Sequence, residues 1–180
     1  MQKQISITAY TFDELSEKAK DVARAWFIEG DIWDKRYSST FEDAAQAGIT
    51  IDDFETDSWE NVHNLKISLD DGALNTMNYI LDNHGKDCDT YKAAEAYENA
   101  IDELPDLPEE SAENYRVIHS ALCEGADAIE SDFIIALEKC YTRMLKQEFE
   151  DRRSNEYVDE TILANEYWFT VDGKRFAEAD

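Results

Sequence analysis

The chain has 180 residues, of which 43% are hydrophobic and 12% are aromatic, and its 42 acidic and 17 basic residues give a net charge of -25. This length and apolar content exclude a disordered tail and predict a single folded domain over residues 1–180. The charge disfavours direct contact with nucleic acid or with an anionic membrane, because like charges repel over a Debye length of about 10 Å. The same field would attract a basic protein partner.

The cysteines and the N-terminal sequence predict a cytoplasmic protein. Cys88, Cys123 and Cys140 are odd in number and lack the spacing of a disulfide scaffold or of a zinc site. Residues 1–7 lack the apolar core of a signal peptide, and no run approaches the roughly 20 apolar residues that span a bilayer. We therefore expect no disulfide bond, no membrane segment and no bound metal.

The N-terminal third begins with an alternating pattern and continues with two helical patterns. Residues 5–9 alternate apolar and polar side chains, which predicts a short strand. Residues 11–14 read as a capping box, and Ser16 is a second candidate N-cap for a helix that Gly30 would end. A further helix is expected from about residue 33 to residue 47.

The middle of the chain predicts a strand pair followed by a helix. Residues 49–54 and 65–69 both alternate, and we expect them to pair as a hairpin or a meander. The next apolar pattern, over residues 74–81, predicts a helix that ends at residues 83–85, where Gly85 would take the left-handed conformation.

Residues 89–152 predict a long antiparallel helical hairpin that extends from the domain. Asp89 is a candidate cap for a helix over residues 91–104, and the chain's two prolines follow as a turn. Between residues 109 and 152, apolar side chains recur every three or four positions without an intervening proline, which predicts a helix of about 60 Å.

The C-terminal part predicts one short helix and a hairpin. The helix is expected over residues 154–164, and the Asp172–Gly173 dipeptide suits a type I′ turn between two strands. The fold class expected from all elements is α+β and helix-dominated, with a small antiparallel sheet, packing helices and the long antiparallel helical hairpin.

No catalytic motif is present in the sequence, which lacks a phosphate-binding glycine loop, a nucleophile elbow and paired metal ligands. The strongest candidate for chemistry is the segment 83–90, which holds His84, Cys88 and two aspartates. Helix ends account for each of these residue types, so we favour a structural role there over catalysis. We expect no enzymatic activity, no catalytic residue and no cofactor.

The acidic surface carries more information than any motif. Carboxylates three or four positions apart on a helix lie roughly 5 to 6 Å apart, which coarsely matches the charge spacing of a nucleic-acid backbone. A solvated face that serves only solubility is the alternative. The candidate partner-binding residues crowd the predicted helical turn and the start of the long helix: Asp102, Glu103, Asp106, Glu109, Glu110, Glu113, Asp127 and Glu130.

Three stretches of the sequence resemble a family of small acidic proteins encoded by bacteriophages and prophages. They are YTFDELSEKAK at residues 10–20, NHGKDCDTYK at residues 83–92 and ANEYWFTVDGKR at residues 164–175. The segment from Phe41 to Ile49 also resembles this family, and the resemblance extends over most of the chain except residues 102–126. The family has no secure biochemical activity, and some of its members carry an antitoxin-like label, so no residue role is carried across. The resemblance implies the cytoplasm of a phage-infected bacterium as the setting.

Two functional hypotheses follow from the charge and the resemblance. The first is an anti-defence inhibitor that binds a basic, nucleic-acid-handling bacterial protein, such as a CRISPR effector or a restriction enzyme, with mimicry of DNA as one route. The second is an antitoxin-like or regulatory adaptor that binds a host protein through an apolar surface. Salt separates them, because screening weakens only the charge-driven complex. The sequence leaves the oligomeric state open, a homodimer included.

Overall fold

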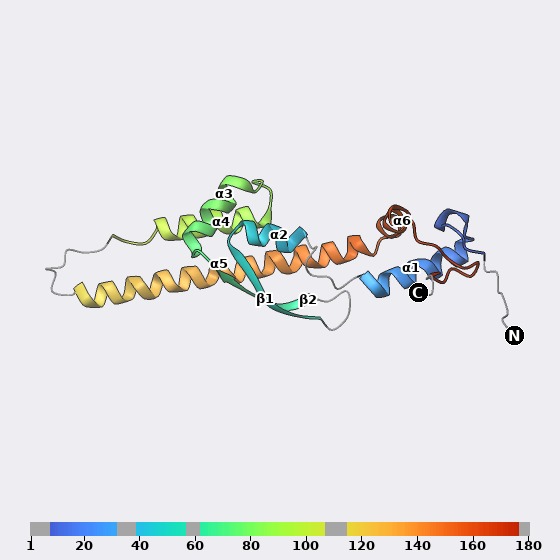
Figure 1. Cartoon of the computed structure of the whole chain (residues 1–180). Helices are drawn as coiled ribbons and strands as arrows, with labels where there is room; N and C mark the ends of the chain where they lie inside the picture. Colours follow the sequence, from blue (N-terminus) through green and yellow to red (C-terminus); the bar gives the residue numbers. More distant parts are fainter. Residues whose placement is uncertain (1–7, 32–38, 57–61, 107–114, 177–180) are drawn as a thin grey trace. The chain divides into compact units, whose positions relative to one another are not determined.

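The computed structural model describes residues 8–31, 39–56, 62–106 and 115–176 (Figure 1). The chain divides into two compact units. The terminal unit comprises Met1–Arg36 and Gln147–Asp180, and the central unit comprises Tyr37–Lys146. That residues 1–180 act as one domain with 89–152 as an extension stays a prediction.

The described residues confirm a helix-dominated α+β fold. In the central unit, β1 (Ile49–Thr56) pairs antiparallel with β2 (Val62–Leu69), as the alternating pattern predicts. The register runs from Ile49 opposite Leu69 to Thr56 opposite Val62, with irregularities on both sides of Asp53. The buried side chains of the two strands are Ile49, Phe54, Val62, Leu65 and Ile67, so the strand pair contributes to the core of the unit.

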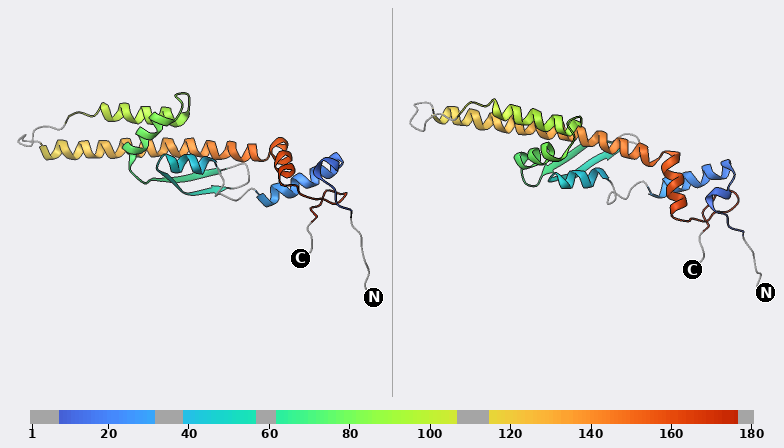
Figure 2. Two further views of the ribbon diagram at one scale, coloured as in Figure 1. Left: turned by 45° about the horizontal axis from the view of Figure 1, so that its top comes forward. Right: turned by 90° about the horizontal axis from the view of Figure 1, so that it is seen from above.

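Four helices of the described chain contribute to the central unit: α2 (Ser39–Gln46), α3 (Ala73–Asn83), α4 (Asp89–Asp102) and the first part of α5 (Tyr115–Arg152). Figures 1 and 2 show α4 lying antiparallel along α5. The rings of Tyr97 and Phe133 stack at 4.5 Å between these helices, and Leu104 packs against Gly125. The expected helical hairpin is therefore present, and its turn includes residues 107–114, which lie outside the described residues.

The terminal unit packs η1 (Phe12–Glu14), α1 (Glu17–Asp31) and α6 (Asn155–Ala164) around an aromatic core. The predicted caps are confirmed, because the Thr11 backbone N–H donates to the Glu14 carboxylate at 2.9 Å and the Ala19 backbone N–H donates to the Ser16 hydroxyl at 3.3 Å. The guanidinium of Arg24 joins α1 to α6 with two hydrogen bonds, of 2.6 and 2.7 Å, to the Asp159 carboxylate. The buried core consists of Phe12, Leu15, Ala19, Ala23, Phe27, Val158, Ile162 and Phe169.

The predicted type I′ turn is wrong. That turn needs positive φ at both central residues, and of Asp172 and Gly173 only Gly173 has it, at +85°. The Gly173 N–H donates to the Thr170 carbonyl at 2.9 Å and the Thr170 N–H to the Lys174 carbonyl at 2.8 Å, which makes a three-residue loop with glycine in the left-handed position. Isolated bridges join Phe169 to Tyr10 and to Arg175. Residues 5–7 of the predicted first strand lie outside the described residues.

Three predicted helix boundaries also differ. Gly30 lies inside α1 and does not end it. Gly85 does not take the left-handed conformation, because His84 already ends α3 in an extended conformation. Asp89 does not cap α4; it is the first helical residue, and the N-cap is Cys88 without a side-chain capping bond. The Asp89 carboxylate instead pairs with Arg143 on α5 at 2.7 Å. Of the helix expected over 33–47, residues 39–46 are described and helical.

Candidate partner-binding surface

Five of the eight predicted partner-binding carboxylates lie among the described residues, and all five are exposed. Asp102 is the last residue of α4, Glu103 is its C-cap, and Asp106 follows shortly after. Asp127 and Glu130 belong to α5, the helix that Figure 2 shows beside α4. The other three, Glu109, Glu110 and Glu113, lie outside the described residues.

Carboxylates of α5 and of the turn before α3 line one groove beside the helical hairpin. This groove, of about 460 Å³, lies between α4, α5 and the start of α3. Asp127 and Glu130 line it from α5, and Tyr97 and Ile101 line it from α4. Burial raises the pKa of the Tyr97 phenol, and the negative charge of Glu130 raises it further. The Glu130 carboxylate on α5 is therefore close enough to α4 to influence the ionisation of Tyr97.

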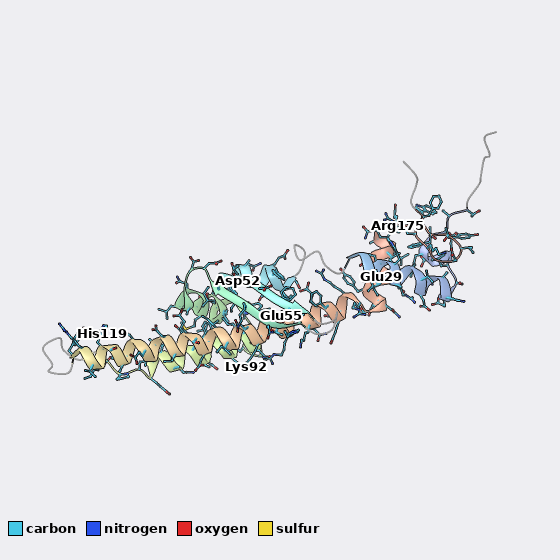
Figure 3. All side chains as sticks on the ribbon, turned by 90° about the horizontal axis from the view of Figure 1, so that it is seen from below. Glu29, Asp52, Glu55, Lys92, His119 and Arg175 are labelled. Atoms are coloured by element: carbon cyan, nitrogen blue, oxygen red, sulfur yellow. The ribbon has the colours of Figure 1, made fainter. Side chains whose placement is uncertain are left out.

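The charge of the hairpin between residues 91 and 132, on either side of its turn, is almost entirely of one sign. Residues 91–132 contain twelve acidic and two basic residues, Lys92 and Arg116, which leaves a net charge of -10. Lys92, labelled in Figure 3, pairs with Asp89 at 3.8 Å. Across the described parts of the chain, none of the five described carboxylates of the surface takes part in an ion pair. Solvent and salt screen their mutual repulsion.

Two of these acids also sit where the helix backbone disfavours them. Asp102 and Glu103 are at the C-terminal end of α4, where the unsatisfied carbonyl groups carry partial negative charge. Natural helices favour cations at that position. Acidic residues there lower the stability of the isolated hairpin, and a basic partner would relieve the repulsion.

The structure adds residues to this surface that sequence patterns missed. Asp71 and Leu74, at the start of α3, line the same groove, and the Leu74 side chain is 57% exposed. Nearer the start of α5, the His119 imidazole Nδ1 lies 3.6 Å from the Cys123 sulfur (His119 is labelled in Figure 3). This contact could have been predicted from the sequence, because side chains four positions apart on a helix are neighbours.

The segment 83–90 forms a polar network that crosses the central unit. His84 Nδ1 lies 2.8 Å from the Thr90 hydroxyl oxygen, and His84 Nε2 lies 3.8 Å from an Asp43 carboxylate oxygen. The buried Tyr141 hydroxyl donates to the other Asp43 oxygen at 3.0 Å. The network thus joins α2, the α3–α4 connection and α5. Each polar group has a structural partner, which favours a packing role over chemistry.

Cys88, the nucleophile that catalysis at this segment would need, is exposed beside Gly85, and no described contact joins it to His84. A cavity of about 390 Å³ adjoins the network and is lined by Cys88, Cys140 and Arg143 among others. Within the described ranges, no three metal-binding side chains come together. The described contacts therefore show neither a base hydrogen-bonded to Cys88 nor a set of metal ligands.

We expect an alkylating reagent to modify the three thiols at different rates. Cys88 and Cys123 are exposed, whereas Cys140 is 5% exposed and burial raises the pKa of its thiol. Iodoacetamide reacts with the thiolate, so Cys140 should be modified at least about tenfold more slowly than the other two. Peptide mass spectrometry of timed samples measures the rates. In denaturant the three rates should converge, and rapid labelling of Cys140 in the native protein would contradict the packing of α5.

Comparison with protein-family models, with curated proteins and with solved structures finds no match to this chain. No described helix is both long and apolar enough to cross a bilayer.

Proposed function

We propose that this chain is an acidic inhibitor that binds a basic, nucleic-acid-handling protein in the bacterial cytoplasm. The observation that carries the proposal is the one-signed charge of residues 91–132, where Asp102, Glu103, Asp106, Asp127 and Glu130 are exposed and take part in no described ion pair. The likeness to bacteriophage proteins supports the setting, in which a defence nuclease such as a CRISPR effector or a restriction enzyme is the target.

The physical case is electrostatic. A basic nucleic-acid cleft attracts closely spaced negative charges at long range and gains affinity by releasing the counterions of both partners. Asp127 and Glu130 of α5 and Asp71 before α3 line one groove, so their fields add. Docking would also relieve the repulsion around Asp102 and Glu103 at the end of α4. A surface that served only solubility would need no such concentration of one sign.

The proposal predicts that the protein captures basic proteins and that salt or an added polyanion releases them. Immobilised protein should retain basic nucleic-acid-binding proteins from bacterial lysate in about 50 mM salt, and about 500 mM salt should release them, since screening removes long-range attraction. Added duplex DNA should also release them, because it would occupy the same cleft. Quantitative mass spectrometry of the eluates measures both effects.

Three results would count against the proposal. They are the absence of basic proteins at low salt, retention that is indifferent to salt, and retention that is indifferent to DNA. Salt-indifferent retention would support instead the antitoxin-like adaptor that binds through an apolar surface. The exposed Leu74 beside the groove offers such an adaptor an apolar contact.

A further inference from the structure

The terminal unit contains a cavity of about 350 Å³ whose lining combines aromatic rings with carboxylates. Buried Phe12 and Ile162 belong to the core of the unit and form the apolar part of the lining. Tyr167 and Trp168 add aromatic surface, and Trp168 is 50% exposed. The volume is at the lower end of the range of about 300 to 1,000 Å³ found for small-ligand sites.

Two exposed carboxylates line this cavity from opposite ends of the chain. Asp13 comes from η1, and Glu166 comes from the turn after α6. Neither side chain takes part in an ion pair or hydrogen bond anywhere in the described ranges. The φ angle of Glu166 is +52°, which a residue with a side chain rarely adopts. The fold therefore holds a carboxylate at the cavity at some conformational cost.

The cations of the same unit that lie near this lining are already engaged. Lys20 pairs with Glu17 at 3.2 Å, and Arg24 pairs with Asp21 and Asp159. Arg175, labelled in Figure 3, lies 5.0 Å from the ring centres of both Trp26 and Tyr167. Its position shows that the aromatic cluster of this unit accommodates a guanidinium group.

From this geometry we infer a second binding site, which takes one arginine side chain from a protein partner. The guanidinium would stack on the exposed ring of Trp168 and donate hydrogen bonds to the carboxylates of Asp13 and Glu166. A planar, permanently charged group satisfies the rings and the carboxylates together, whereas a lysine ammonium stacks less well. The site does not rest on the hairpin proposal, although a basic partner would supply the arginine.

The test uses the full chain with its four tryptophans replaced by 5-fluorotryptophan. Fluorine NMR follows the Trp168 resonance, assigned with W168F, while Nα-acetyl-arginine amide is added to about 50 mM. We expect a saturable shift with half-saturation on the order of 1 to 10 mM, as befits one weak cation contact. The lysine analogue should bind more weakly, and the neutral, isosteric citrulline analogue should cause no saturable shift.

The variant D13N/E166Q removes both carboxylate charges and should raise the half-saturation concentration at least about tenfold. The control E156Q/E160Q removes the same charge from exposed positions of α6 that do not line the cavity, and it should bind like the wild type. Charge reversal on the helical hairpin should leave the arginine response unchanged, which separates this site from the proposed function. The inference is overturned by the absence of saturation, by equal responses to arginine and citrulline, or by an unchanged half-saturation in D13N/E166Q. The arginine and citrulline comparison needs no variant and is decisive even if D13N/E166Q misfolds.

Discussion

Gly173→Ala should destabilise the terminal unit by about 3 kcal/mol or more. Gly173 has a φ of +85°, where an alanine side chain costs roughly 1 to 2 kcal/mol. A Cβ atom there would also overlap the carbonyl oxygen of Ala19 and lie 2.8 Å from its carbonyl carbon. Because the obstacle is the backbone of α1, no rotamer change relieves the clash, and overpacking of this kind costs about 1 to 3 kcal/mol more.

Thermal and urea unfolding measure this effect, with near-UV circular dichroism reporting on the aromatic core around Phe12 and Phe169. Gly30→Ala is the matched control, because Gly30 lies inside α1 with no atom within 4 Å of its would-be Cβ and without a positive φ. That change should leave stability unchanged or raise it by about 0.5 to 1 kcal/mol. Equal unfolding midpoints for the two variants would show that the loop at Gly173 does not contact α1 as described.

Reversing four charges of the hairpin should weaken partner binding by about 100-fold in low salt. The variant D102K/E103K/D127K/E130K changes the net charge by +8 and acts on both helices of the groove. A single exposed charge contributes little, so the effect depends on removing the summed field, which raises association rates by roughly 10- to 1,000-fold. The amounts of basic proteins retained from one lysate, quantified by mass spectrometry, measure the loss.

The control must change the same charge at exposed carboxylates elsewhere. Glu14 caps η1, and Glu17 and Asp21 are ion-paired, so reversing those three would disturb the fold of α1 as well as the field. The variant carrying lysine at four other exposed positions avoids this: Asp82, Asp87, Glu150 and Glu160. If the hairpin variant is folded by circular dichroism and still retains as much basic protein as this control, the acidic hairpin is not the binding surface.

The order and type of the elements of the central unit and the charge of its surface could be predicted from the sequence alone. Alternation over residues 49–54 and 65–69 predicted β1 and β2, because alternate side chains of a half-buried strand face the core. Apolar spacing of three and four residues predicted the helices of the hairpin, and the proline turn predicted their antiparallel course. The one-signed charge of residues 91–132 can be counted in the sequence without reference to structure.

Helix and turn ends were predicted less well, since their conformation depends on distant contacts. Asp89 has the side chain of an N-cap, but Arg143 on α5 offers its carboxylate a closer charged partner. Asp172–Gly173 has the composition of a type I′ turn, yet the three-residue loop formed instead brings Gly173 against the backbone of Ala19. Local preferences of this kind differ by about 1 kcal/mol, so tertiary packing overrides them.

Which side chains come together at one cavity or groove could not be predicted from the sequence and follows from the packing of the helices. Asp13 and Glu166 are more than 150 positions apart, and they line one cavity because α6 packs against η1 and α1. Asp127 meets Ile101 and Asp71 at one groove because α4 and the start of α3 lie beside α5. The spacing of apolar residues predicts which face of a helix or strand is buried, but it does not predict which other element covers that face. The partners across each groove therefore follow from the packing of whole helices, whose free energy is summed over contacts between residues far apart in the chain.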